Sequence, residues 1–275
     1  MPELPEVETI VRGLEPILIG KRIKSLFFLS AHLKKKQPAW ALRPETYKDQ
    51  KIEKITRRGK LIIISLERQK GLLVHLKMTG QLFLAEPGRP LDKHTHAVMT
   101  FYGLKKELRF RDLRKFGLIN CLPKSQIEEK VAKSLGPEPL EVKLKEFRRL
   151  LETRGRKKIK SWLLDQKIIA GIGNIYSDEI LFQSGIHPER LSGSLSLEES
   201  WKLFRAMKSV LKKAIRFKGS SISDYIDSLG QRGEFQKLHQ VYGRENQMCR
   251  RCRAARIERK KIGGRSSFFC PNCQV

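Results

Sequence analysis

The first residues of the chain bring together groups that can do covalent chemistry. The sequence opens MPELPEVETI, with Pro2 and Glu3 directly behind the start methionine. Start methionines are commonly removed when the second residue is small, and removal here would leave the secondary amine of Pro2 as the N-terminus. Terminal amines have a pKa of about 7.7–8.0, against about 10.4 for lysine, so more of such an amine is unprotonated at neutral pH. Pro2 is therefore a candidate nucleophile, with Glu3 beside it as a candidate acid.

Four cysteines near the C-terminus have the spacing of a metal site. Cys249 and Cys252 form one C-x-x-C pair, and Cys270 and Cys273 form another. Four thiolates supplied by two such turns can surround zinc tetrahedrally, which leaves no open position for catalysis. A redox role would need only one pair. We therefore expect one structural Zn²⁺, and we expect Cys121 to be a small buried apolar residue.

The charge of the chain indicates a polyanionic partner. Its 275 residues include 57 Lys+Arg against 29 Asp+Glu, a formal net charge of +28. An excess of this size is typical of proteins that bind nucleic acid. Membrane binding is disfavoured, because no apolar run approaches the length of a span and no basic amphipathic helix carries an aromatic face. The acidic N-terminus does not resemble a secretion signal and the cysteines do not suggest a disulfide framework, so we expect a cytoplasmic protein.

Several short motifs combine cations with glycine. Gly263 and Gly264, between the cysteine pairs, predict a hairpin turn with Arg265 at its tip, where arginine can contact a phosphate. The stretch AGIGNIYSDE fails the dinucleotide fingerprint, because Tyr176 stands at the third glycine position. Its glycines predict a turn that opens a helix able to hold a phosphate. Asn174 at the start of this helix either caps it, binds DNA, or does both.

Other stretches have two interpretations. RDLRKFG sets Arg114 and Lys115 beside Phe116, which is either a core aromatic or a wedge that enters a base stack. HLKMTG raises the same ambiguity for Met78. Upstream of AGIGNIYSDE lies a run of cations that we expect to form mostly a solvated face: Arg154, Arg156, Lys157, Lys158 and Lys160.

The spacing of apolar residues changes along the chain. Helical spacing predicts a helix over about 5–15, which Pro16 would end or bend. Between Gly20 and Ser125, short apolar or alternating runs predict a β sandwich: RIKSLFFL, KLIIISL, GLLVHLKM, QLFLAE, HAVMTFY, ELRFRD and GLINCLP. Residues from about 143 to 217 are predicted to be helical, with a capping box at Ser196 and Glu199 and a helix-ending glycine at Gly185.

Taken together, these motifs resemble the formamidopyrimidine-DNA glycosylase family, bacterial enzymes that remove oxidised purines. The matching stretches occur in the family's order nearly end to end: MPELPEVET, RRGK, HLKMTG, RDLRKFG, LGPEPL, GIGNIYSDE, GIHPER, QVYGR and the final cysteines. The resemblance implies an α+β fold with DNA in a cleft. Its parts would be an N-terminal β sandwich with a leading helix (1–135), a helix–two-turn–helix domain (140–235) and a C-terminal β-hairpin zinc finger (236–275).

The resemblance also implies roles for individual residues. Pro2 would be the nucleophile and Glu3 the acid at the sugar, with Lys60 and Arg265 in later steps. The DNA contacts that the resemblance implies are His94, Arg114 and Arg156, and the residues that fill the space left by an everted nucleotide are Met78, Arg114 and Phe116. From their motifs, Asn174 and Lys115 are further expected DNA contacts. Family members often carry glycine or arginine at the position of Lys77 and arginine at that of Lys115, and both differences keep or add positive charge.

The expected function is base-excision DNA repair by a bifunctional glycosylase and AP lyase. Attack of Pro2 at C1′ gives an iminium with no N–H to lose, which stays cationic and promotes loss of the C2′ proton. Base excision and strand cleavage by β,δ-elimination thus follow from one nucleophile. The expected substrate is double-stranded DNA with 8-oxoguanine, formamidopyrimidines or abasic sites, and the expected protein is a nucleoid-associated monomer.

Two alternatives stay open. One is an endonuclease VIII-like lyase for oxidised pyrimidines, but that branch usually starts with glycine in place of Leu4, so the intact PELPEVE favours the purine branch. The other is a non-catalytic zinc protein that only binds damaged DNA. The Pro2–Glu3 pair argues against it, because binding needs neither residue.

Overall fold

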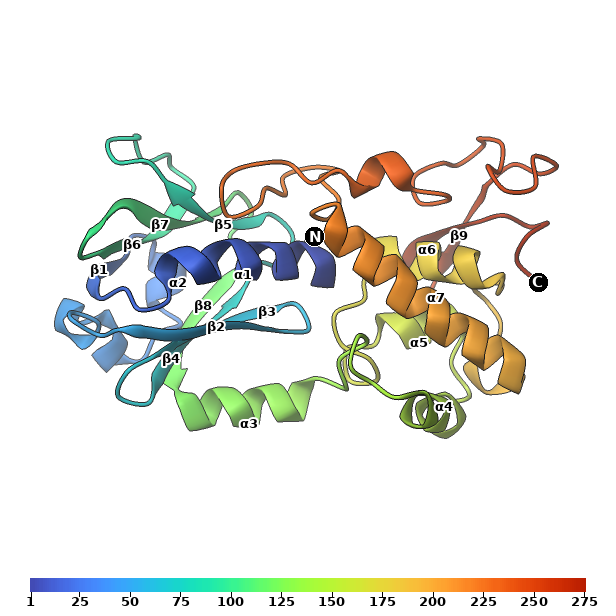
Figure 1. The fold of residues 1–275 in the computed structure, drawn as a ribbon, viewed down its shortest axis with the longest axis horizontal. Helices are drawn as coiled ribbons and strands as arrows, with labels where there is room; N and C mark the ends of the chain where they lie inside the picture. The colour runs from blue at the N-terminus through green and yellow to red at the C-terminus, as the bar shows by residue number, and fades with distance from the viewer. The chain divides into compact units, whose positions relative to one another are not determined.

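The computed structural model describes residues 1–275, apart from the side chain of Pro44, and the chain divides into two compact units (Figure 1). The first unit is Met1–Lys133 with Phe217–Glu234, and the second is Ser134–Arg216 with Phe235–Val275. No helix in the described part of the chain is both long and apolar enough to cross a bilayer. The three domains expected from the sequence (1–135, 140–235 and 236–275) have boundaries that differ from those of these two units. The division into three domains remains a prediction.

Two four-stranded antiparallel sheets form most of the first unit. One sheet has the order β1-β6-β7-β5. Its strands are β1 (Ile23–Phe28), β5 (Gly80–Ala85), β6 (Thr95–Phe101) and β7 (Leu104–Asp112). The other has the order β2-β3-β4-β8. Its strands are β2 (Ile52–Arg58), β3 (Leu61–Leu66), β4 (Lys70–His75) and β8 (Leu118–Pro123).

Both sheets turn one apolar face into a common core, so the expected β sandwich is confirmed. On β3 the side chains alternate, with Ile62, Ile64 and Leu66 buried. They belong to one apolar cluster to which strands of both sheets contribute. Cys121 of β8 lies in this cluster as expected, and burial raises the pKa of its thiol to about 12. Its chemistry is therefore that of a small apolar side chain.

The leading helix α1 (Leu4–Leu18) packs against β2 and β3 (Figure 1). Its buried side includes Val7, Ile10 and Leu14, at the spacing of one helix face. Pro16 is expected from the sequence to end or bend the helix, and an end at Pro16 is wrong, because the helix continues to Leu18. Pro16 lies in the last turn, where its missing N–H removes a single intrahelical bond.

Residues from far along the chain complete the first unit. Within Phe217–Glu234, the Ser228 carbonyl accepts a hydrogen bond from the Leu84 N–H of β5 at 2.8 Å. The Asp224 carbonyl accepts one from the side chain of Gln81. Helix α3 (Lys124–Ser134) follows β8. The first unit also contains three short helical turns: α2 (Ala31–Lys34), η1 (Ala39–Leu42) and η2 (Pro44–Thr46).

The second unit is helical, as predicted. It contains α4 (Leu144–Thr153), α5 (Ile159–Leu164), α6 (Asn174–Ser184) and α7 (Leu197–Arg216), with turns η3 (Ser192–Ser194) and η4 (Phe235–Leu238). Phe147 packs against Trp162 and Phe204, with ring centroids 5.4 and 5.5 Å apart. The predicted caps are confirmed. Ser196 and Glu199 exchange side-chain hydrogen bonds with each other's backbone N–H, and Gly185 ends α6 at φ 76°.

A two-stranded hairpin lies between the cysteine pairs. Its strands are β9 (Glu258–Ile262) and β10 (Arg265–Phe269), and Ile262 pairs with Arg265. Gly263 and Gly264 have φ angles of 56° and 78°, which the tight turn requires and which favour glycine. The predicted turn is confirmed, and Arg265 stands exposed at its tip.

Candidate catalytic and nucleic-acid site

The N-terminal residues are held in place by the first turn of α1. Pro2 is buried, Glu3 is 2% exposed, and Glu3 is the N-cap residue of the helix. Glu6 is the matching residue of a capping box, and its Oε2 accepts the Glu3 N–H at 2.7 Å. The backbone that carries Pro2 and Glu3 is thereby fixed at the positive end of a helix.

Glu6 also joins α1 to the segment Phe217–Glu234. Its Oε1 accepts the Ser220 N–H at 2.7 Å, and its backbone carbonyl accepts the Tyr225 hydroxyl at 3.3 Å. At Gly219, φ is 76°, and a Cβ would lie 2.5 Å from Glu6 Oε1. The sequence interpretation did not connect these segments, although a glycine before a run of hydroxyl residues is a signal for such a close approach.

Lys60 lies in the turn between β2 and β3, directly after Gly59 at φ 56°. The side chain of Lys60 is 6% exposed. Burial, together with the positive charges of Lys77 and Lys60, lowers the pKa of His75 to about 3. His75 is therefore neutral at physiological pH, and its Nδ1 accepts the Lys77 N–H at 3.0 Å.

Met78, Arg114 and Phe116 come from two different turns and lie together. Arg114 Nη1 approaches Met78 Sδ at 3.3 Å, and the Arg114 guanidinium carbon lies 4.8 Å from the Phe116 ring centroid. All three side chains are exposed, with Met78 at 43% and Phe116 at 50%. A core role for Met78 and Phe116 is therefore excluded, and the three side chains form one exposed cluster of an aromatic, a thioether and a cation.

Lys115 and His94 are the other expected DNA contacts in the first unit. Lys115 is exposed between Arg114 and Phe116. His94 is partly exposed, and its carbonyl accepts the Asp112 N–H at 2.9 Å, so it lies next to the end of β7.

In the second unit, the start of α6 and the hairpin tip form one site. Asn174 is the first residue of α6 and does not cap it, because Gly173 is the N-cap residue. Asn174 Nδ2 donates to the Ser266 carbonyl at 2.9 Å, next to Arg265. A Cβ on Gly263 would lie 2.6 Å from Ser161 Oγ, so the turn also rests on α5. Arg265 thus stands beside a helix N-terminus, an arrangement suited to a phosphate.

The cations upstream of α6 do not share one environment. Arg154, Arg156, Lys157 and Lys158 are exposed, as expected. Lys157 pairs with Asp165 at 2.5 Å, and Lys158 pairs with Glu189 at 2.6 Å. Glu189 also pairs with Lys260 of β9, and the bonds from Lys158 and Lys260 lower its pKa to about 2. The two pairs of Glu189 tie the hairpin to the residues just before α5 and just after α6.

Lys160 is the exception in this run of cations, most of which form a solvated face as predicted. It is fully buried, and its Nζ lies 2.6 Å from Asp178 Oδ1. Asp178 also accepts the Ser267 hydroxyl at 2.7 Å and the Phe268 N–H at 3.1 Å. Burial raises the pKa of Asp178, and these donors offset part of that effect by stabilising the carboxylate. Asp178 thus holds β10 against α5 and α6.

Glu179, the next residue of α6, holds the segment that leads to the zinc finger. Its buried carboxylate accepts the backbone N–H groups of Gln240, Val241 and Tyr242 at 2.9–3.0 Å. Burial raises its pKa, and the three N–H groups counteract the shift. Asp178 and Glu179 therefore fix two chain segments, each of which leads into one of the cysteine turns. The adjacent acids in the stretch NIYSDE were the sequence signal for this.

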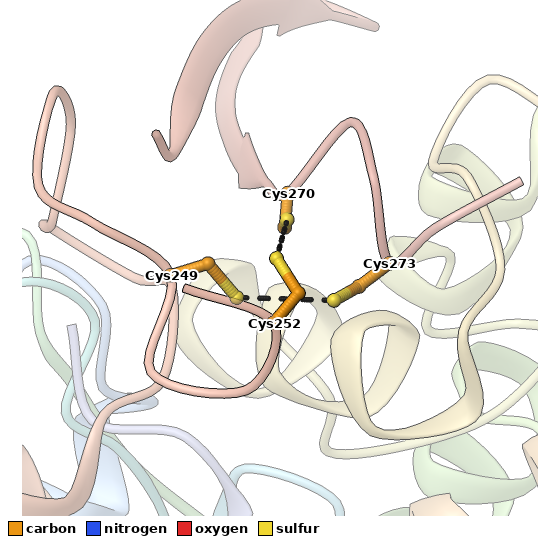
Figure 2. A group of neighbouring side chains, drawn as sticks. All are labelled: Cys249, Cys252, Cys270 and Cys273. Carbon is orange, nitrogen blue, oxygen red and sulfur yellow. Dashed lines mark hydrogen bonds between the residues drawn. The ribbon is translucent and has the colours of Figure 1, made fainter. Parts of the chain in front are cut away.

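The four cysteines converge from two turns, one on each side of the hairpin (Figure 2). Their sulfur atoms lie within 4.8 Å of one another, with 3.8 Å between Cys249 and Cys273 and 3.7 Å between Cys252 and Cys270. Sulfurs bound tetrahedrally to zinc at about 2.3 Å lie roughly 3.8 Å apart. The donor set therefore fits one Zn²⁺. The Arg251 N–H also points to the Cys249 sulfur at 3.4 Å, and such a donor stabilises a metal-bound thiolate.

Models of known families match the chain in three consecutive parts. Residues 1–119 match the formamidopyrimidine-DNA glycosylase N-terminal domain. Residues 135–226 match the formamidopyrimidine-DNA glycosylase H2TH domain, and residues 246–275 match a zinc finger found in FPG and IleRS. The last match agrees with the cysteine geometry and supports one structural zinc.

Full-length relatives agree with the family models. A formamidopyrimidine-DNA glycosylase of Carboxydothermus hydrogenoformans is 42% identical over 276 residues, with both chains fully covered. That of Solibacter usitatus is 44% identical over 275 residues, covering all of this chain and 99% of the relative.

Solved structures show the same fold. A Lactococcus lactis FPG mutant in complex with a Fapy-dG-containing DNA has a TM-score of 0.90 at 36% identity over 99% of each chain. The Lactococcus lactis Fpg with abasic-site DNA has a TM-score of 0.89, also at 36% identity over 99% of each chain. The chain described here belongs to the formamidopyrimidine-DNA glycosylase family.

Proposed function

We propose that this protein is a base-excision DNA repair enzyme that acts as a glycosylase and an AP lyase on oxidised purines. Its substrates are 8-oxoguanine, formamidopyrimidines and abasic sites in double-stranded DNA. The observation that carries the proposal is the buried Pro2–Glu3 pair at the start of α1, in a chain that matches the family from end to end. The relatives in complex with Fapy-dG and abasic DNA support this choice of substrate.

The reaction begins at the amine of Pro2 after Met1 has been removed. The amine lone pair attacks C1′ of the damaged nucleotide, and the bond from C1′ to the base breaks with its electron pair on the departing base. The N–H proton that Pro2 loses neutralises this base. Glu3 donates a proton to the ring oxygen as the sugar opens, which leaves an iminium between Pro2 and C1′. Both residues act from a backbone that the capping box holds in place.

Strand cleavage follows from the same iminium. The cation draws electrons from C2′. The C2′ proton therefore leaves, and the bond from C3′ to the 3′ phosphate oxygen breaks. In a second elimination the C4′ proton leaves and the bond from C5′ to the 5′ phosphate oxygen breaks. Hydrolysis of the iminium then releases Pro2. Lys60 and Arg265 assist these later steps by holding the phosphate or sugar with positive charge.

DNA is bound mainly through its phosphates. The exposed cations Lys115, Arg156 and Arg265 neutralise phosphate charge, and His94 and Asn174 add polar contacts. The start of α6 supplies backbone N–H groups toward a phosphate. The net charge of +28 is consistent with a monomer that binds DNA in the cytoplasm and nucleoid.

C1′ is shielded while the nucleotide is stacked, so the nucleotide must first leave the helix. The cluster of Met78, Arg114 and Phe116 fills the resulting space. Phe116 wedges beside the unpaired base, and Met78 and Arg114 occupy the vacated position.

Zinc is held by Cys249, Cys252, Cys270 and Cys273, and it supplies folding energy to the hairpin that carries Arg265 and takes no part in the chemistry.

Borohydride trapping tests the proposal. The protein is incubated with duplexes that contain 8-oxoguanine or an oxidised pyrimidine, in the presence of borohydride. We expect a covalent adduct with the 8-oxoguanine duplex, mapped by mass spectrometry to the N-terminal peptide that begins with Pro2. An uncleaved N-terminal tag should abolish the adduct.

The other outcomes separate the alternatives. Preferential trapping on the pyrimidine duplex would favour the endonuclease VIII-like activity. Binding without an adduct would favour a non-catalytic damage-binding protein, and an adduct that maps to Lys60 would overturn the assignment of Pro2.

A further inference from the structure

We propose that Asp112 is a positioning residue that joins the two turns carrying Met78, Arg114 and Phe116 into one preformed wedge. The inference rests on the proposed function, because it gives these three side chains their role in filling the space of an everted nucleotide. It concerns a residue that touches neither the substrate nor the reacting atoms. Asp112 acts through the backbone of the turns.

The carboxylate of Asp112 is bonded to both turns. It is 1% exposed, and its Oδ1 accepts the Thr79 hydroxyl at 2.5 Å and the Arg114 N–H at 3.2 Å. Its Oδ2 accepts the Gly117 N–H at 2.6 Å. The Arg114 N–H also points to the Thr79 hydroxyl oxygen at 3.1 Å, which closes a ring between the two turns. Thr79 follows Met78, and Gly117 follows Phe116.

Each turn contains backbone that needs such support. Lys77, which precedes Met78, has φ 54°, and Lys115, which precedes Phe116, has φ 58°. This left-handed conformation is unfavourable for a residue with a side chain, and it persists where surrounding contacts impose it. His75 supports the first turn by accepting the Lys77 N–H, and Asp112 supports the second from both sides of Lys115.

The hydrogen bonds of Asp112 to Thr79, Arg114 and Gly117 form a joint between the two turns. The space around Gly117 shows that this joint is closely packed. A Cβ at this position would lie 2.6 Å from Phe110 Cζ and 3.0 Å from Asp112 Oδ2. The main chain after Phe116 therefore approaches the Asp112 carboxylate as only glycine can. A side chain here would push the turn away from the carboxylate.

A preformed wedge matters when the nucleotide leaves the stack. Exposed side chains on loose turns would have to be ordered at that moment, which raises the barrier. An abasic nucleotide has no base to unstack, so it depends less on the wedge. Loss of the joint should therefore slow excision of an intact lesion more than cleavage at a preformed abasic site, a difference that general loss of folding does not produce.

The test compares Thr79→Val with Thr79→Ser in single-turnover reactions. Valine has the shape of threonine without the hydroxyl, while serine keeps the hydroxyl. We expect Thr79→Val to slow excision of 8-oxoguanine about five- to tenfold, the effect of losing one hydrogen bond or slightly more, and to change abasic cleavage by less than about twofold. Thr79→Ser should behave like wild type. Thr100→Val on β6, which removes a hydroxyl bonded to Ser25, controls for the substitution itself.

Hydrogen exchange tests the joint without relying on activity. In the free protein, the amides of Arg114 and Gly117 should be protected. Asp112→Asn should speed the exchange of at least one of them roughly tenfold, because the asparagine side chain keeps one acceptor oxygen and replaces the other with an NH2 donor. If Thr79→Val and Asp112→Asn act through one joint, the double variant should be little slower in excision than the slower single variant.

Different outcomes would overturn the joint and the proposed function. Unchanged exchange in Asp112→Asn, or equal slowing of Thr79→Val on lesion and abasic duplexes, would overturn the joint. If the wild-type protein excises no oxidised purine but Asp112→Asn speeds the exchange of the Arg114 or Gly117 amide, the proposed function is overturned and the joint stands.

Discussion

Lys160 Nζ lies 2.6 Å from Asp178 Oδ1, and neither side chain is exposed to solvent. The pair lies where α5, α6 and β10 meet, since Asp178 also accepts from Ser267 and Phe268. A buried ion pair gains little net stability over apolar residues of the same shape, but removing one partner leaves an uncompensated charge. Loss of either partner should therefore weaken the attachment of the hairpin to α5 and α6.

Removing one partner of this pair should destabilise the second unit strongly. We expect Asp178→Ala to cost about 3–5 kcal/mol, because the Lys160 ammonium is then buried without its carboxylate. Combining Lys160→Met with Asp178→Leu should restore only part of the loss, because the Ser267 hydroxyl and the Phe268 N–H then lack their acceptor. Ser267→Ala, which removes one neutral donor, should cost about 1 kcal/mol. Urea unfolding followed by circular dichroism checks the order of the three variants, and a mild Asp178→Ala would contradict the expectation.

Removing a zinc ligand should unfold the hairpin. Cys252→Ala or Cys273→Ala should lose the metal and weaken DNA binding, because zinc supplies much of the folding energy of so small a unit. Cys121→Ala is the matched control and should keep one zinc per chain, since Cys121 lies in the apolar core. Arg265→Ala should keep the metal but lose DNA affinity and late-step cleavage. Metal analysis and binding titrations measure these effects, and wild-type protein purified without stoichiometric zinc would contradict them.

DNA affinity should fall steeply with salt. If Arg156, Lys115 and Arg265 each neutralise a phosphate, removing one of them should reduce the slope of log affinity against log salt by about 0.9. Lys106→Ala is the control, because Lys106 of β7 is a partly exposed cation paired with Glu86 and is not an expected contact. Titrations between low and high salt provide the slopes. A nearly flat wild-type dependence would mean that the charge of +28 serves another purpose.

Local patterns predicted the elements that carry the site better than they predicted contacts between distant segments. Pro2, the cysteine pairs and the Gly263–Gly264 turn depend on neighbours in the sequence, and each could be recognised there. Strand β2 was missed because only Ile52 and Ile55 of IEKITRR are buried, so its apolar pattern is short.

Contacts between residues that are distant in the sequence were not predicted, for a different reason. The attachment of Ser220 to Glu6 spans 214 positions and has no periodic signal. Lys160 and Asp112 have types that are usually exposed, and only the fold shows that their partners are buried with them.

His75 should stay neutral well below its usual range. Its folded pKa of about 3 is lower than the unfolded value of about 6.5, so the unfolded chain binds the proton more readily between these values. Stability from His75 is therefore fully present above about pH 6.5 and is lost as the pH falls toward 3, by on the order of 1 kcal/mol per pH unit. NMR titration should show an unprotonated ring at about pH 5. His75→Asn, which keeps an acceptor for Lys77, should have a weaker pH dependence of unfolding, and a ring that titrates near its usual pKa of about 6.5 would contradict the prediction.

Arg114 should read the base opposite the lesion. Among the three side chains of the cluster it alone has directed donors, and the free edge of cytosine offers acceptors at O2 and N3. Adenine presents a donor at N6, which arginine cannot satisfy because it has no acceptor. Lesions opposite cytosine should therefore be excised faster than lesions opposite adenine, and a mismatch of this kind costs roughly 1–3 kcal/mol. The bias is useful, since excision opposite adenine would fix a mutation.

Single-turnover excision from both duplexes measures this preference. Arg114→Ala should be slower overall, and its rates on the two duplexes should converge. Lys115→Ala is the matched control, because it removes the adjacent exposed cation and should weaken binding to both duplexes equally while the ratio of rates is kept. If Arg114→Ala slows both reactions by the same factor and the preference for cytosine survives, Arg114 only fills space, and the discrimination must come from another residue at the wedge.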